Sequence, residues 1–189
     1  MSVLGPLIAL LGVVVGGALS YVFAALGESR KERWALGREW RGRKIDAYAT
    51  YMADVRHLRD SAQRVAAGAG LDDTALPLSR EEGVERLSEA NLVRNRSFET
   101  VTLLADGEVV EAGRALNRAV WRLEWFARGL LDDRDTEGWR TACHAYSDAV
   151  NAFHECARRE LGVQGRFTPR EPEVSPRSRY EQERKLTGG

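Results

Sequence analysis

The pattern of hydrophobic and polar positions divides the chain into one uncharged stretch followed by several amphipathic ones. No charged side chain occurs from Met1 to Gly27, and this stretch contains the run LGPLIALLGVVVGGALSYVFAALG. A helix needs about 20 apolar residues to cross roughly 30 Å of hydrocarbon, so the run is long enough to span a bilayer. A charge inside such a span is costly, which makes its complete absence informative. The pattern predicts a transmembrane anchor over residues 1–27.

A cleaved secretory signal is the alternative for the same stretch. The apolar run is longer than a typical signal core, and no lysine or arginine precedes it. No convincing small-x-small cleavage site follows it either. These three features favour an anchor that is retained.

Basic residues follow the apolar run immediately, in residues 28–44. The segment reads ESRKERWALGREWRGRK and contains seven basic side chains and three glutamates. By the positive-inside rule, a basic flank after the span places the following domain in the cytoplasm. We expect a helical stalk whose interface anchors are Arg30, Lys31, Arg33, Trp34 and Trp40. The alternative is a topology signal on a solvated helix that makes no contact with lipid.

Farther along, apolar residues recur at alternating spacings of three and four, the period of amphipathic helices. Four such stretches of about 24–26 residues would each be roughly 36–39 Å long. No stretch shows the two-residue alternation of strands. The sequence therefore predicts an all-α fold: an N-terminal transmembrane helix followed by an up-down four-helix bundle over residues 45–161.

Turn and capping residues mark the expected helix ends. The first helix ends at about Ala67, before AGAGLDDTALPLS, whose glycines and proline break the pattern. Ser79 and Glu82 form a capping box at the start of the second helix. Gly107 is suited to a left-handed helix end after the second helix. Thr136 is the expected cap of the fourth helix.

The same periodicity predicts which side chains are buried. Among these positions, Ile45, Val84 and Leu130 are each expected to lie on the core face of their helix. Trp121, Trp125 and Phe126 are expected to widen the buried arc of the third helix. If Trp125 is exposed instead, it becomes a candidate docking anchor for another protein.

The last segment, residues 162–189, has a different composition. It holds three of the five prolines, interleaved charges and few large apolar residues. Such a segment buries too little surface to offset the entropy lost on ordering. We expect a disordered tail.

Within the predicted span, small residues recur every four positions at Gly12, Gly16, Ser20 and Ala24. Small residues at this spacing let two helix backbones approach closely, which favours self-association in membranes. A homodimer is therefore one hypothesis. The alternative is that glycine and alanine are simply common in membrane helices.

The second helix contains a local inconsistency. Its apolar stripe is interrupted by Asn91 and Arg94, and Asn95 follows. Rules that are broken locally are often broken at functional sites, so these three residues are a candidate polar pocket, facing Asp54 or His57. The alternative is that the helix rotates locally or that Arg94 extends outward to pair with a carboxylate.

No pattern in the sequence points to catalysis or to a metal. Cys143 and Cys156 fall within one predicted helix about 20 Å apart, too far to form a disulfide. The histidines have no second set of ligands at metal-binding spacing. No phosphate-binding loop and no nucleophile elbow occurs. We expect no catalytic residues, no cofactor and no metal, although residues brought together by folding would escape this reading.

The formal charge is zero, with 28 basic and 28 acidic residues, so no overall field favours nucleic acid. The layout resembles a loose group of single-pass membrane proteins from GC-rich actinobacteria with no assigned activity. The features that carry the resemblance are the glycine-rich span and the segments RKERWALGREWRGRK, KIDAYATYMADVRHL and LLADGEVVEAGRAL. The resemblance implies a cytoplasmic helical bundle and assigns no functional residue.

These observations lead to a functional hypothesis. We expect a membrane-tethered interaction or regulatory module at the cell membrane, which binds a cytoplasmic protein partner. The alternative is a small membrane effector, as in toxin or defence systems, that acts through an oligomerising transmembrane helix. An enzyme with a cryptic site ranks third.

Overall fold

A computed structural model describes residues 37–170 of the chain. The chain divides into two compact units, residues 1–43 and 44–189. The predicted membrane span over residues 1–27 lies outside the described residues and stays a prediction. Within residues 37–170, no helix is both long enough and apolar enough to cross a membrane.

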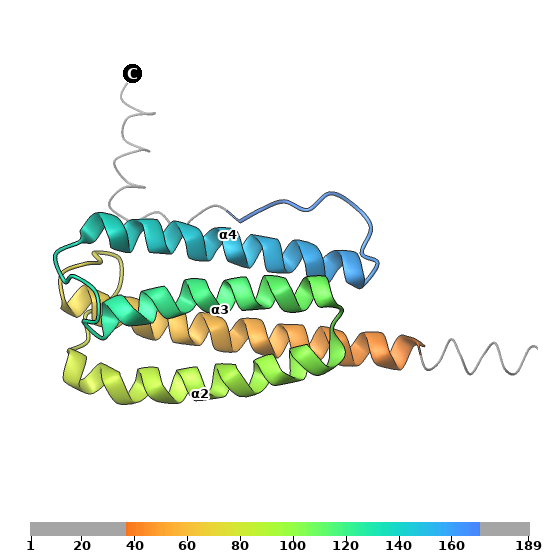
Figure 1. Cartoon of the computed structure of the whole chain (residues 1–189), viewed down its shortest axis with the longest axis horizontal. Helices are drawn as coiled ribbons and strands as arrows, with labels where there is room; N and C mark the ends of the chain where they lie inside the picture. The colour runs from red at the N-terminus through yellow and green to blue at the C-terminus, as the bar shows by residue number, and fades with distance from the viewer. Residues whose placement is uncertain (1–36, 171–189) are drawn as a thin grey trace, which may run out of the picture. The chain divides into compact units, whose positions relative to one another are not determined.

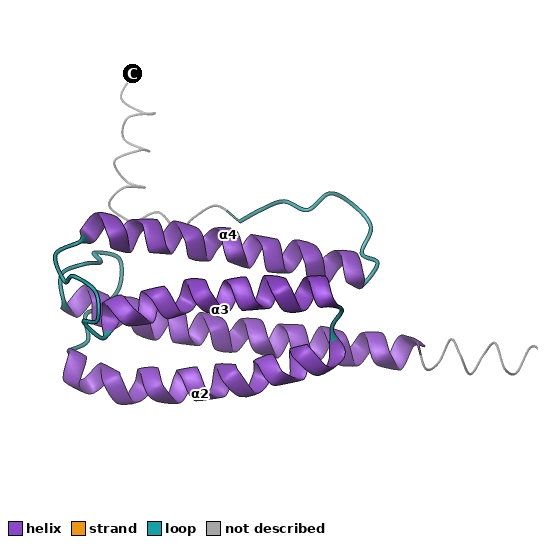
Figure 2. Ribbon diagram, viewed as in Figure 1, coloured by secondary structure: helices purple, strands orange, loops and turns teal. Residues whose placement is uncertain are grey.

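Residues 44–170 of the second unit contain four helices, and consecutive helices run in opposite directions (Figure 1). Helical structure covers residues 37–68, of which 44–68 form the first helix of this unit. The others are α2 (Arg80–Leu104), α3 (Gly107–Ala127) and α4 (Thr136–Glu160). Only helices and loops occur in the described part of the chain (Figure 2). The predicted all-α bundle is confirmed.

Side chains cap the helix starts largely as expected. The Ser79 hydroxyl accepts a hydrogen bond from the Glu82 amide at 3.3 Å, and it donates to the Glu82 carboxylate at 3.0 Å. The prediction that Thr136 caps α4 is wrong. Asp135 is the cap, because its carboxylate accepts from the Gly138 amide at 2.7 Å, and Thr136 is the first helical residue.

Three helices end at a glycine with positive φ, a conformation that side chains disfavour. These are Gly70, Gly129 and Gly162. After α3, the Gly129 amide donates to the Phe126 carbonyl and the Leu130 amide to the Trp125 carbonyl, which is a Schellman motif. The expectation that Gly107 ends α2 in this way is wrong. Ala105 ends α2 in an extended conformation, and Gly107 begins α3.

The core consists of two apolar clusters stacked along the bundle. One includes Leu58, Leu87 and Phe126, and the other includes Tyr51, Val101 and Phe153. Three expected core residues lie outside these clusters, because Ile45, Val84 and Leu130 are exposed. Leu130 follows the glycine that ends α3, so it no longer continues the helical stripe.

The loop between the first helix and α2 is organised by one carboxylate. Asp72 accepts hydrogen bonds from the Thr74 amide at 2.7 Å and from the Trp139 indole of α4 at 3.0 Å. Burial would raise the pKa of Asp72, but its hydrogen bonds outweigh this effect and lower the pKa. The loop is therefore fixed to the end of α4 by a charged acceptor.

Residues 162–170, the first part of the predicted tail, form neither helix nor strand. After α4, this segment turns back and runs along that helix (Figure 1). The Asn151 side chain donates to the Arg170 carbonyl at 3.0 Å and accepts from the Arg170 amide at 2.9 Å. These two hydrogen bonds satisfy the backbone of Arg170 in the way a strand partner would. The remainder of the predicted tail, residues 171–189, lies outside the described residues.

Candidate functional site: the two faces of α2

Arg94 lies in the bundle core, with none of its surface exposed. On α2, Leu87 and Ala90 belong to one apolar cluster and Val101 to the other. Arg94 falls between them along the helix and therefore separates the two clusters. The alternative that Arg94 extends outward to the surface is wrong.

The Arg94 guanidinium has few partners for a buried charge. It donates to the Asn91 side-chain oxygen and lies 5.0 Å from the centre of the Trp121 ring, a cation–π contact. Its Nε and Nη1 atoms have no hydrogen-bond partner within residues 37–170. Burial lowers the pKa of this group, and the nearby Tyr51 and Glu124 oppose the shift only in part.

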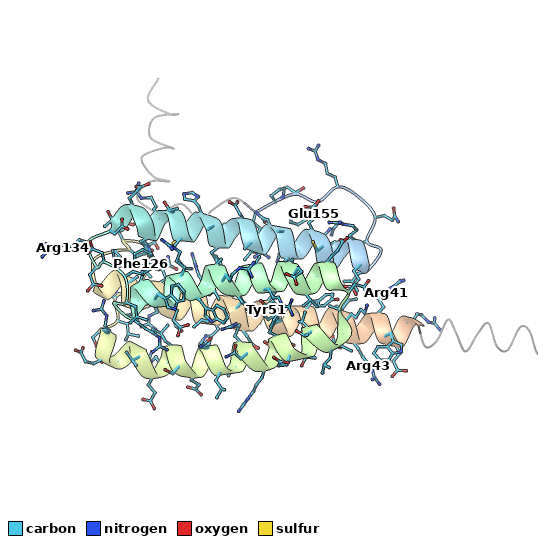
Figure 3. The ribbon with its side chains drawn as sticks, in the orientation of Figure 1. Arg41, Arg43, Tyr51, Phe126, Arg134 and Glu155 are labelled. Carbon is cyan, nitrogen blue, oxygen red and sulfur yellow. The ribbon has the colours of Figure 1, made fainter. Side chains whose placement is uncertain are left out.

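Other polar side chains surround this position. The Tyr51 hydroxyl lies 2.8 Å from the Asn117 side-chain oxygen and 3.1 Å from the Gly113 carbonyl. Tyr51 points into the interior of the bundle (Figure 3). Burial raises the pKa of Tyr51, so its hydroxyl stays protonated and able to donate. Together, Arg94, Asn91, Trp121, Tyr51 and Asn117 form what we call the polar layer of the core.

The structure brings together only two of the three residues in the hypothesised pocket. Asn91 and Arg94 share a hydrogen bond, whereas Asn95 is exposed. The expected neighbour His57 is also exposed. Sequence reasoning missed Trp121 and Asn117, because both lie on α3 and only folding brings them beside Asn91 and Tyr51.

The outward face of α2 has the opposite character to its core face. Leu103 is 84% exposed and Leu92 is 51% exposed, while Val84 and Val93 are also exposed. Leu92 and Leu103 are eleven residues apart, about three helical turns, so they lie on the same side of the helix. α2 therefore places a charge in the core and large apolar side chains in solvent. As a result, it is less amphipathic than α3 and α4.

Charges flank these apolar side chains. The exposed side chains of α2 include more carboxylates than guanidinium groups. The carboxylates are Glu81, Glu82, Glu85, Glu89 and Glu99, and the guanidinium groups are Arg86 and Arg96. The outward face of α2 thus carries exposed apolar side chains among charged ones, with a net excess of carboxylates. Trp125 on the neighbouring α3 is 44% exposed. Its exposure makes it a candidate docking anchor for another protein.

The cysteines and histidines all lie within residues 37–170. Cys143 and Cys156 are both partly buried on α4. Within residues 37–170, no group of three or more histidine, cysteine or carboxylate side chains is arranged to hold a metal ion.

Most of the predicted membrane-contacting residues lie outside the described part of the chain. This holds for the small-residue face of Gly12, Gly16, Ser20 and Ala24 and for Arg30, Lys31, Arg33 and Trp34. Trp40 is described: it is half exposed, and the Arg43 guanidinium lies 5.6 Å from the centre of its ring. Arg43 also pairs with Glu39 at 2.6 Å.

Comparison of the chain with protein-family models, curated proteins and solved structures finds no match.

Proposed function

We propose that this protein is a membrane-tethered interaction module that binds a cytoplasmic protein through the outward face of α2. The observation that carries the proposal is the exposure of Leu92 and Leu103 on one side of a helix whose core side holds a buried charge. Exposed apolar side chains gathered on one face are typical of protein-binding surfaces. The tether is the predicted span over residues 1–27, and the partner is cytoplasmic by the charge of the segment that follows it.

The charge of the face favours one kind of partner. An acidic surface is repelled by anionic lipid headgroups, so α2 is poorly suited to lie on the cytoplasmic leaflet. A basic amphipathic helix is complementary in both respects. Its apolar stripe would cover Leu92 and Leu103, and its basic flanks would pair with Glu85 and Glu89.

Site-specific photocrosslinking in intact cells tests this proposal. A photoreactive phenylalanine analogue replaces Leu92 or Leu103 in the full chain, and the same analogue replaces the exposed Arg140 of α4 as a matched control. We expect a discrete adduct from both α2 positions and none from the control. Mass spectrometry of the adduct should place the crosslink within a basic amphipathic helix of the partner.

Charge reversal gives a second measurement. Glu85→Lys together with Glu89→Lys should reduce the adduct yield at the Leu103 position several-fold, because like charges then meet. These residues are exposed, so the free energy of unfolding should change by no more than about 0.5 kcal/mol. Equal adducts at the α2 and α4 positions, or a yield unaffected by charge reversal, would contradict the proposal.

A further inference from the structure

The segment that returns along α4 builds a pocket against the first helix of the bundle. Asn151 holds the backbone of Arg170 through the two hydrogen bonds described above. The pocket has a volume of about 80 Å³. Its lining includes Met52, Tyr146, Val150 and three arginines, Arg56, Arg59 and Arg170.

The pocket is strongly basic. Arg59 pairs with Asp60 at 3.0 Å. Arg56 and the Arg170 side chain form no ion pair with any residue in the range 37–170. Three arginines from two separate segments, the first helix and the returning segment, therefore line one pocket.

The charge of the pocket affects the pKa of a neighbouring histidine. His154 is on α4, one turn beyond Val150, and its Nε2 atom is buried without a hydrogen-bond partner in the described part of the chain. Burial lowers the pKa of His154, and the charges of Arg170 and Arg56 lower it further. The cationic field of the pocket thus extends to a buried nitrogen that can bind a proton.

From this geometry we infer that the pocket binds a phosphate group, either as inorganic phosphate or as the headgroup of a small phosphomonoester. Guanidinium groups match phosphate oxygens in geometry, and hydrogen bonds between them are charge-assisted. The volume is several times the roughly 10–15 Å³ that one water molecule requires, so it admits a compact anion. Met52 and Val150 add apolar surface to the lining, which suits the organic part of a monoester.

This site is separate from the outward face of α2. Its lining comes from the first helix, α4 and the returning segment, with no contribution from α2. The two proposals can therefore fail independently.

Isothermal titration of the full chain, purified in detergent micelles, tests the inference. The probes are inorganic phosphate and phenyl phosphate, each at constant ionic strength. We expect saturable binding at one site, with a dissociation constant in the millimolar range or below. Tighter binding of phenyl phosphate would identify a monoester as the ligand, and tighter binding of inorganic phosphate would identify the free anion.

Arginine variants locate the site. Arg56→Gln and Arg170→Gln should each weaken binding by about ten- to a hundredfold, the loss expected for a charge-assisted hydrogen bond. Arg56→Lys should lose less, because it keeps the charge and loses only the planar geometry. Arg86→Gln on α2 is the matched control, since it removes an exposed guanidinium outside the pocket lining and should leave the affinity unchanged.

His154 provides a readout that does not depend on heat of binding. A bound phosphate should raise the pKa of His154, measured from the imidazole resonances in an NMR titration, because the anion offsets the two guanidinium charges. Failure of both probes to bind, or equal weakening by Arg86→Gln and Arg56→Gln, would overturn the inference. So would a pKa of His154 that saturating phosphate leaves unchanged.

Discussion

At the scale of single residues, the most unusual feature is the burial of Arg94. A charge taken out of water loses several kcal/mol of solvation, and its partners must compensate. Arg94 has Asn91 and the face of Trp121, while its Nε and Nη1 atoms lack a partner in residues 37–170. Because an incompletely paired buried charge lowers stability, retaining Arg94 costs the bundle free energy.

The first prediction concerns this cost. Arg94→Met keeps an unbranched side chain of similar length and removes the charge, so it should raise the free energy of unfolding by about 1–4 kcal/mol. Urea unfolding measures the change. The matched control is Arg86→Met, on the exposed side of the same helix, which should change stability by no more than about 0.5 kcal/mol.

A double-mutant cycle separates the charge from the packing. Asn91→Ala in the wild-type chain should lower the free energy of unfolding by about 1–3 kcal/mol, because Arg94 then loses its side-chain acceptor. In the Arg94→Met background, the same change should cost much less. If Arg94→Met destabilises the bundle, Arg94 is adequately paired in the native protein. An equal cost of Asn91→Ala in both backgrounds would show that Asn91 and Arg94 are not coupled.

At the scale of elements, close backbone contacts decide how the helices and loops meet. A Cβ atom on Gly68, at the end of the first helix, would lie 2.2 Å from the Leu78 carbonyl oxygen. That oxygen belongs to the backbone of the loop that precedes α2, so it cannot move aside as a flexible side chain can. Gly68 is therefore required by the approach of this loop to the first helix.

The second prediction follows from this contact. Gly68→Ala should lower the free energy of unfolding by about 1–3 kcal/mol, the usual cost of overpacking. Gly107→Ala is the control, because no atom lies within 4 Å of the added Cβ and the residue is helical. That substitution should stabilise the protein by about 0.4–1 kcal/mol through the unfolded state. Equal effects of the two substitutions would contradict the proposed contact.

At the scale of the whole bundle, one carboxylate joins three separate parts of the chain. Glu160 is at the end of α4, and its side chain is only 6% exposed. It accepts hydrogen bonds from Lys44 and Tyr48 of the first helix and from the Asp106 amide between α2 and α3. Burial would raise the pKa of Glu160, but these donors outweigh that effect and lower it.

The third prediction is a pH dependence with a definite sign. A carboxylate whose pKa is lowered by folding stabilises the protein above its ordinary pKa of 4.5, and this stabilisation is lost as the pH falls through the lowered value. Glu160→Gln should therefore cost about 1.5–3 kcal/mol at neutral pH, the range for hydrogen bonds to a charged group. Unfolding measured at a series of pH values should show this difference shrinking below pH 4.5. A difference that is constant with pH would show that the charge of Glu160 is not involved.

The helices were predictable because their signals are local. Periodic apolar residues, the capping pair Ser79 and Glu82, and the glycines after Ala67 lie close together in sequence, and short-range sterics and hydrogen bonds fix their conformation. The cap of α4 was predicted wrongly because two adjacent residues can both cap a helix. Asp135 and Thr136 are both good caps, and the choice between them depends on where the chain leaves the preceding turn.

What the sequence by itself determined is the all-α class, the four helices of the bundle and the approximate position of each break, because each depends on interactions within a few residues. Only the tertiary structure decided whether Arg94, which interrupts the apolar stripe of α2, is buried or extends to the surface, because its burial depends on the side chains that α3 brings beside it. Only the tertiary structure placed Arg170 beside Arg56, which is 114 residues away in sequence. Long-range packing sets both. The free energy of burial depends on which surfaces meet in the folded protein, and the periodicity of the sequence does not show which surfaces these are.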